Sequence, residues 1–383
     1  MHVGIDARFF GPSSSGLGRY TAELIDNLLA LDANVRLTLF LRPEGYHVYA
    51  NHPQVTRVLF PYRWYTLTEQ LRFPPVLRRA QADVLHFPHF NVSVFSPQPF
   101  VVTVHDLILH DFPTERASTL SRTQYWLKRK AYHVVIRRAI ERAARIITIS
   151  EYSKQNLLRH FPISPRRVAV TYEGASAIVP PASEQADQAV VAKYHLRPGY
   201  VLYVGNAYPH KNLEMLLRAW VRVRAANPRL VLVVAGKDDY FRQRLQAFAA
   251  SLDLEPGREV VFPGFVPDAD LGAFYRGAGL YVFPSLSEGF GLPGLEAMRC
   301  GLPVASSRSS CLPEVFGDAA VYFDPKRPDD MARVIVETLA SPRQLAELRA
   351  RGFVQVKKYS WRRLASETLA VYRSVVEVTN GTR

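Results

Sequence analysis

The chain has 383 residues, which is too long for one ordinary hydrophobic core and fits two domains. Hydrophobic residues make up 48% and charged residues 21%, and these values exclude a largely disordered chain. The formal net charge of +14 at pH 7 favours anionic partners such as phosphates, lipid headgroups or nucleic acid. Neither of the two cysteines, Cys300 and Cys311, has a second Cys or a His at metal-ligand spacing, so no metal site is indicated.

The N-terminus lacks the features of a secretory signal. Met1 leads directly into His2-Val3-Gly4-Ile5, without a basic region, an apolar stretch and a cleavage site. The longest apolar runs, such as residues 230–235, are far shorter than the roughly 18 to 20 residues that span a bilayer. We therefore expect a cytoplasmic protein.

The first half of the chain alternates short apolar runs with helical patterns. This alternation predicts a parallel sheet with helices on both faces. Helical spacing covers residues 23–31 and 123–144, and Ser150 has the features of an N-cap for a helix that starts at Glu151. The expected strands lie near residues 2–6, 35–41, 83–87, 100–104 and 145–149.

A Pro- and Ala-rich stretch at residues 179–183 interrupts the alternation, and we place an interdomain linker there. A second alternation follows, and the last helix, from Trp361 to about Val376, has no strand after it. The predicted domains are residues 1–178, 179–360 and a terminal helix at 361–383. The expected strands of the second domain lie near residues 200–204, 230–235, 259–262, 280–283, 303–306 and 320–323.

The densest positive charge lies between Arg116 and Arg145, where nine Lys and Arg residues accompany the single acid Glu141. A basic helical face of this kind suits an anionic membrane surface, and a solvated helix face is an equally good interpretation. Tyr125, Trp126 and Tyr132 lie within the stretch.

The segment from Phe283 to Met298 follows a predicted strand and opens a predicted helix. Pro293 suits the first helical position, so the glycine-containing turn before it should leave amides free to bind phosphate or sugar oxygens. Glu288 precedes the helix, and Glu296 is expected in its first turn. Two carboxylates eight residues apart could grip the hydroxyls of one ligand.

Glu288, seven intervening residues and Glu296, in the frame EGFGLPGLEAM, resemble the paired-glutamate motif of the retaining transferases of glycosyltransferase family 4, also called glycosyl transferases group 1. The resemblance implies a GT-B fold: two Rossmann-like domains facing each other across a cleft, with the C-terminal helix crossing back to the first domain. It places Glu288 beside the donor sugar and Glu296 at the nucleotide ribose. It also assigns donor contacts to the amides of Phe290, Gly291 and Leu292.

The loop from Val204 to Leu213 resembles the diphosphate loop of the same family. The resemblance makes Gly205 and Asn206 donor-binding residues and gives Lys211 the role of neutralising the leaving nucleotide. Many relatives have Arg directly after the glycine, where this chain has Asn206. A second cation for the diphosphate could therefore come from Lys237 or Arg19.

Residues 11–20 form a Gly- and Ser-rich segment after the first strand, and a turn there would bring amides close to donor phosphates. Gly16, Gly18 and Arg19 are the candidate donor-binding residues. A dinucleotide fingerprint is improbable, because Thr21 occupies the place of the third glycine.

His105 follows the run Thr103-Val104 at the end of an expected strand. It resembles the family histidine beside the donor sugar, which makes it a candidate catalytic residue, although a single histidine is as often a core residue. Asp268 and Asp270 imitate a metal-binding pair, yet they precede a helical stretch and are better explained as an N-cap.

The resemblance implies transfer of a hexose with retention at the anomeric carbon, without a metal or another cofactor. GDP-mannose is the first choice of donor and UDP-glucose the second, because the chain is similar to bacterial polysaccharide mannosyltransferases. A glycan or lipid-linked saccharide is the expected acceptor, which places the enzyme at the inner face of the plasma membrane if the basic stretch binds lipid. The alternatives are a non-catalytic nucleotide-sugar-binding or nucleic-acid-binding protein, and an epimerase on the same fold. No nucleic-acid-binding module is recognisable, and the oligomeric state stays open.

Overall fold

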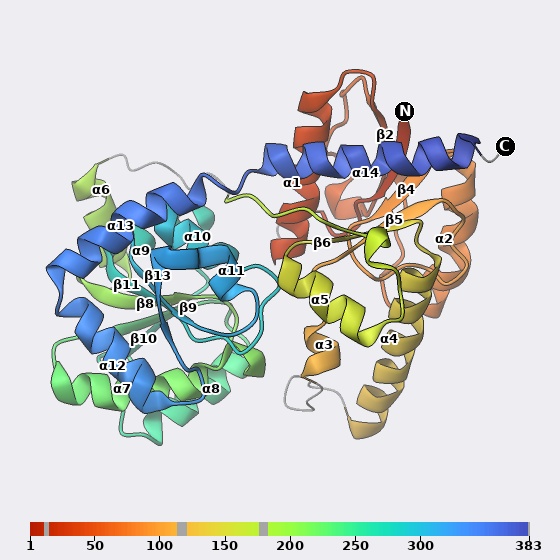
Figure 1. Ribbon diagram of the computed structural model, residues 1–383. Coiled ribbons are helices and arrows are strands. Elements are labelled where there is room, and N and C mark those ends of the chain that lie inside the picture. The colour runs from red at the N-terminus through yellow and green to blue at the C-terminus, as the bar shows by residue number, and fades with distance from the viewer. Residues whose placement is uncertain (11–14, 113–120, 176–182, 382–383) are drawn as a thin grey trace. The chain divides into compact units, whose positions relative to one another are not determined.

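The structure is a computed structural model that describes residues 1–10, 15–112, 121–175 and 183–381 (Figure 1). The chain divides into two compact units. We call Met1–Leu107, Ser118–Gly174 and Ser360–Arg383 the N-terminal unit, and Ile108–Ala117 with Ala175–Tyr359 the C-terminal unit. The expected linker at residues 179–183 lies, apart from Ser183, outside the described residues.

The N-terminal unit is built on a seven-stranded parallel sheet in the order β3-β2-β1-β4-β5-β6-β7. Its strands are β1 (His2–Asp6), β2 (Arg36–Leu41), β3 (Val55–Leu59), β4 (Val84–Phe87), β5 (Phe100–Val104), β6 (Arg145–Thr148) and β7 (Val168–Val170). Its helices are α1 (Ser15–Leu31), α2 (Leu67–Arg79), α4 (Arg122–Arg142), α5 (Glu151–His160) and α14 (Trp361–Gly381). The short helix α3 (Ile108–Asp111) follows β5 and is grouped with the C-terminal unit.

The five strands predicted for this half are present, with ends that agree to within one residue. The N-cap at Ser150 is also confirmed, because its side chain accepts a hydrogen bond from the amide of Ser153. The strands β3 and β7 and the helices α2 and α3 were missed; β7 and α3 are only three and four residues long, and β3 and α2 depart from the usual patterns. β3 is an edge strand with partly exposed side chains, and α2 contains Pro74 and Pro75.

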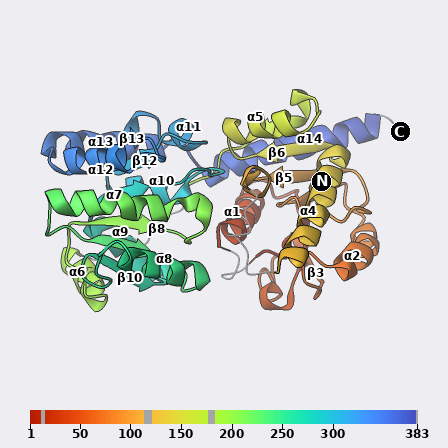
Figure 2. The ribbon, with the colours of Figure 1, turned by 90° about the horizontal axis from the view of Figure 1, so that it is seen from below.

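The C-terminal unit is built on a six-stranded parallel sheet in the order β10-β9-β8-β11-β12-β13. Helices α7 and α12 pack together on one face of the sheet, and α9, α10 and α13 belong to the other (Figure 2). All six predicted strands are found. They are β8 (Tyr200–Val204), β9 (Leu232–Ala235), β10 (Val260–Gly264), β11 (Ala278–Phe283), β12 (Val304–Ser307) and β13 (Ala320–Phe323). The helices are α6 (Glu184–Lys193), α7 (Leu213–Ala226), α8 (Tyr240–Ala250), α9 (Asp268–Gly277), α10 (Leu292–Arg299), α11 (Leu312–Phe316), α12 (Pro328–Leu339) and α13 (Pro342–Val356).

The last helix, α14, returns to the N-terminal unit, as the family resemblance implied, and it lies beside α1 (Figure 1). At its start, Gly174 must be a glycine, because a Cβ there would lie 2.3 Å from the Trp361 nitrogen. Farther along, the buried Tyr372 hydroxyl lies 2.6 Å from Nδ1 of His86, and Nε2 of His86 lies 2.8 Å from the Thr103 hydroxyl. The helix is therefore bound to the sheet by buried polar contacts as well as by apolar packing.

Tyr372→Phe should destabilise the N-terminal unit, because it leaves Nδ1 of the buried His86 without its partner. We expect a loss of about 1 to 3 kcal/mol in the free energy of unfolding, measured by urea denaturation. Tyr240→Phe is the matched control, since Tyr240 is half exposed. Equal stability of the two variants would show that the hydroxyl of Tyr372 contributes nothing.

Candidate active site

The candidate site of the C-terminal unit lies where its sheet changes direction. β8 and β11 are neighbours at the centre of the sheet, and the chain leaves β8 toward β9 and β11 toward β12, on opposite sides. Ligands of doubly wound sheets bind at the carboxyl ends of strands at such a point. Gly205 to Asn212 follow β8, and Pro284 to Gly291 follow β11, so both predicted donor loops meet here.

Lys211 and Glu288 form an ion pair at this point. The Lys211 ammonium donates to both carboxylate oxygens of Glu288 at 2.8 Å, and the side chains are only 17% and 9% exposed. Each residue was predicted separately from its own motif, Lys211 for the nucleotide and Glu288 for the sugar. The structure brings the two opposite charges into direct contact.

Hydrogen bonds fix the backbone on both sides of this pair. The Glu288 amide donates to the Ser310 hydroxyl at 3.0 Å, and the Cys311 thiol donates to the Glu288 carbonyl at 3.3 Å. Asn212, with φ of 61°, donates from its side chain to the carbonyls of Pro284 and Pro325. The two loops are thus joined to each other, and the Lys211–Glu288 geometry is pre-organised.

Burial controls the titration of the neighbouring groups. Burial, together with the Lys211 charge, lowers the pKa of His210 to about 4. Burial raises the pKa of Tyr281 well above its ordinary value, and the charges of Glu288 and Glu296 raise it further. His210 and Tyr281 are therefore neutral at pH 7.

Helix α10 begins one residue earlier than predicted. Gly291 caps it with φ of 105°, Leu292 is its first residue and Pro293 its second. Gly291 is required here because a Cβ would lie 2.9 Å from the Leu312 side chain. Within the described chain, the amides of Gly291 and Leu292 donate to no protein group, which leaves them available to an anion. The Phe290 side chain is buried and packs against Tyr359.

Glu296 lies in the second turn of α10, so its expected place in the first turn was wrong. The helix starts at Leu292, four residues before it. Glu296 is buried, and one of its oxygens accepts a hydrogen bond from the Tyr275 hydroxyl at 3.0 Å. Its contact with a ribose stays a prediction.

The loop after β8 approaches the end of β9 closely. A Cβ on Gly236 would lie 2.0 Å from the Gly205 carbonyl oxygen. Asn206 has a buried side-chain oxygen to which no described group donates a hydrogen bond. Lys237 is exposed two residues after β9, at the same edge of the sheet. It stays a candidate for the second diphosphate cation.

In the N-terminal unit, the turn expected at residues 11–20 is largely helical. Helix α1 begins at Ser15, so Gly16, Gly18 and Arg19 lie in its first two turns, while residues 11–14 lie outside the described chain. The prediction failed because glycines at positions 16 and 18 disfavour a helix on propensity alone, and packing against α14 offsets that cost.

His105 lies directly after β5, and the centroid of its imidazole ring lies 4.6 Å from that of the Tyr20 ring. Its Nε2 lies 2.9 Å from the Pro88 carbonyl oxygen, and its Nδ1 lies 3.4 Å from a carboxylate oxygen of Glu173. Glu173 was not predicted as a site residue, because no motif marks it. Only the tertiary structure brings it from beyond β7 to the end of β5.

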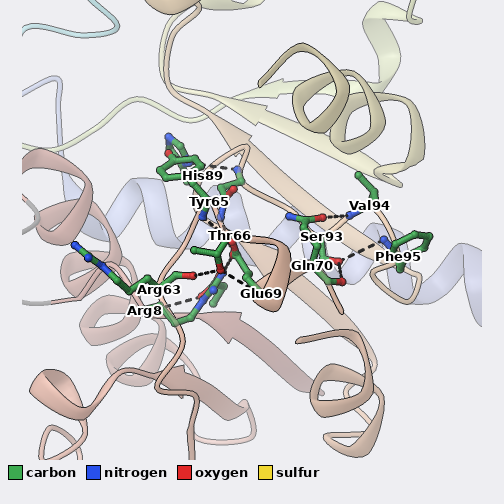
Figure 3. A network of polar contacts seen from close by, with 12 residues as sticks. Arg8, Arg63, Tyr65, Thr66, Glu69, Gln70, His89, Ser93, Val94 and Phe95 are labelled. Atoms are coloured by element: carbon green, nitrogen blue, oxygen red, sulfur yellow. Dashed lines mark hydrogen bonds and ion pairs between the residues drawn. The ribbon is translucent and has the colours of Figure 1, made fainter. Parts of the chain in front are cut away.

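A buried ion cluster follows β1. The Arg8 guanidinium contacts both Asp6 and Glu69 at 2.7 Å, and the Asn91 side chain donates to Glu69. In Figure 3 the rings of Tyr65 and His89 lie together next to this cluster. These residues were not predicted either, since a charged residue after a strand is normally solvated.

Asp268 and Asp270 occupy the first turn of α9, and Pro267 is the N-cap, so the prediction of an aspartate cap was wrong. Acids in a first turn are stabilised by the helix dipole without capping it. Asp270 also accepts a hydrogen bond from the Tyr194 hydroxyl at 3.0 Å.

Two family models match the chain. The family described as glycosyl transferases group 1 matches residues 188–354, and the one described as glycosyltransferase family 4 matches residues 14–177. O-antigen chain mannosyltransferase B of Escherichia coli is 30% identical over 94% of this chain and 96% of its own length. The chain belongs to glycosyltransferase family 4.

The solved structures agree on the fold of this family 4 glycosyltransferase. The HepE protein of Anabaena, solved with UDP and glucose, has a TM-score of 0.74 at 16% identity, and the match covers 97% of this chain and 99% of the HepE chain.

A second mannosyltransferase is similar in sequence to part of this chain. The serotype-specific mannosyltransferase WbdA of Escherichia coli is 35% identical over 58% of this chain and 28% of its own length. The GT-B fold and the family resemblance are both confirmed.

Proposed function

We propose that this family 4 glycosyltransferase transfers mannose from GDP-mannose to a glycan or lipid-linked saccharide, with retention at the anomeric carbon. The observation that carries the proposal is the Lys211–Glu288 pair at the crossover of the second sheet. The choice of mannose is supported by the similarity to mannosyltransferases, and UDP-glucose is the second choice of donor.

The proposed chemistry is mainly electrostatic. The bond between the anomeric carbon and the phosphate oxygen breaks, the acceptor oxygen attacks from the same face, and the acceptor proton passes to the departing phosphate. Lys211 and the backbone amides of Gly291 and Leu292 stabilise the negative charge that develops on the diphosphate. Glu288 holds the donor sugar and stabilises its developing positive charge.

Family membership favours an enzyme over a non-catalytic nucleic-acid-binding protein. Fixed protein charges meet the diphosphate in this proposal, so turnover needs no divalent cation. A second cation for the diphosphate would come from Lys237 or Arg19.

Nucleotides and nucleotide sugars should be compared by thermal shift in buffer with EDTA. GDP-mannose at 100 times its dissociation constant should stabilise the protein by about 2.7 kcal/mol, because it binds only the folded state. Lys211→Ala should remove most of that stabilisation. A larger shift with UDP-glucose than with GDP-mannose at the same concentration would identify UDP-glucose as the donor. A thermal shift or a turnover that requires magnesium would contradict the proposed metal independence.

Glu288 and Glu296 should differ in their kinetic roles. We expect Glu288→Gln to lower kcat by about 100-fold at saturating donor, because it removes a charge used in the transition state. Glu296→Gln should instead raise the KM for the donor by about 10-fold, because one strong hydrogen bond to the donor is lost. The control is Glu337→Gln on the exposed surface of α12. Wild-type kinetics in both site variants would refute the assignment.

We also propose that the first half of α4 docks on anionic lipid. Lys128, Arg129 and Lys130 are exposed there, beside Trp126 and Leu127, which are 54% and 63% exposed. Two cations at the end of the basic stretch contribute less, because Arg142 donates to the carbonyls of Val94 and Ser96 and Arg145 donates to that of Arg166. Arg116, the first cation of the stretch, lies outside the described residues. Tyr132, which also lies within the basic stretch, packs against Phe90.

No helix of the described chain is long and apolar enough to cross a membrane.

Co-sedimentation with phosphatidylglycerol vesicles tests this docking. Replacing Lys128, Arg129 and Lys130 by serine should weaken binding about 100-fold at low salt, since each cation contributes about 1 kcal/mol near such a surface. Replacing Arg333, Arg343 and Arg351 of the C-terminal unit by serine gives the same net charge and should leave binding unchanged. Equal losses in the two variants, or no retention of the wild type at low salt, would refute the proposal.

A further inference from the structure

Both ring nitrogens of His105 face hydrogen-bond acceptors. Nε2 lies 2.9 Å from the carbonyl oxygen of Pro88, and Nδ1 lies 3.4 Å from the carboxylate of Glu173. A carbonyl oxygen can only accept, so Nε2 must carry a proton. If Glu173 is ionised, Nδ1 must carry one as well, and the ring is then an imidazolium.

His105 and Glu173 each depend on the opposite charge of the other, because Glu173 is buried. The Glu173 side chain is 6% exposed, and within the described chain no other cation pairs with it. A buried carboxylate without a counter-charge is unfavourable by several kcal/mol, so Glu173 stabilises a charged His105 as much as the reverse.

The remaining groups around His105 come from four elements. Asp106 follows it, the buried His86 and the half-buried His89 lie at the end of β4, and the Tyr20 ring of α1 covers the imidazole. Burial, together with the His105 charge, lowers the pKa of His86 and His89 to about 3, so both stay neutral. From α5, the Ser153 hydroxyl donates to the His105 carbonyl. Burial alone would lower the pKa of His105, but Glu173, Pro88 and Asp106 together raise it above its ordinary value.

We propose that Glu173 is a positioning residue that holds His105 as a fixed cation, and that transfer requires this cation. The inference rests on the proposed transfer reaction. An imidazolium can donate hydrogen bonds from both nitrogens, but it cannot accept the proton of the acceptor hydroxyl. His105 is therefore excluded as the general base.

Histidine side-chain NMR tests the pair without any substrate. In full-length protein labelled with ¹⁵N-histidine, both His105 nitrogens should be protonated at pH 7. In Glu173→Gln, which keeps an acceptor but removes the charge, the His105 titration should move down by about 1 pH unit or more. Glu173→Asp should move it less, and the exposed Glu44→Gln should not move it. A neutral His105 at pH 7 in the wild type, or an unchanged titration in Glu173→Gln, would overturn the proposal.

The pH dependence of transfer tests the requirement for the cation. The protonated form of His105 is lost as the pH rises through its raised pKa, so kcat/KM should fall on the alkaline side. Glu173→Gln should shift that fall to lower pH by the same amount that NMR records. A rise in rate on deprotonation of His105 would identify a base and overturn the proposal. Absence of any transfer would count against the proposed function, and NMR would still decide whether Glu173 holds the charge.

Discussion

The ion pair between Lys211 and Glu288 is the interaction around which the C-terminal unit is arranged. Parallel strands place their carboxyl ends at one edge, and the crossover between β8 and β11 opens that edge to ligands. An ammonium and a carboxylate there would each be poorly solvated alone, because both side chains are mostly covered. As a pair, each compensates the charge of the other, and the hydrogen bonds of Asn212, Ser310 and Cys311 fix the loops that carry them.

The N-terminal unit also pairs buried charges at the ends of its strands, but with different side chains. Its central strands end in buried titratable residues: Arg8 is paired with Asp6 and Glu69, and His105 is paired with Glu173. His86 stays neutral and joins Thr103 to Tyr372 through hydrogen bonds. Each ionised group is matched by an opposite charge, as buried charges must be.

Most of the fold could be predicted from sequence because buried parallel strands appear as short apolar runs between helical patterns. β3 and α2 could not, since an edge strand is half polar and prolines normally end a helix. Glu288 and Lys211 were predicted from their motifs, but they are 77 residues apart, so their pairing depends on the tertiary structure. Glu173 had no local signal at all. The start of α1 was misjudged because tertiary packing overrode the low helix propensity of two glycines.

The position of α14 has a consequence for how the chain folds as it is synthesised. The N-terminal unit contains both the first strand and the last helix, with the C-terminal unit between them in sequence. The ribosome completes all of the C-terminal unit before it releases α14. Until then His86 lacks Tyr372, and the face of the sheet beside α1 stays open to water. N-terminal domains usually fold first during synthesis. Here the N-terminal unit can be completed only after the whole C-terminal unit has been synthesised.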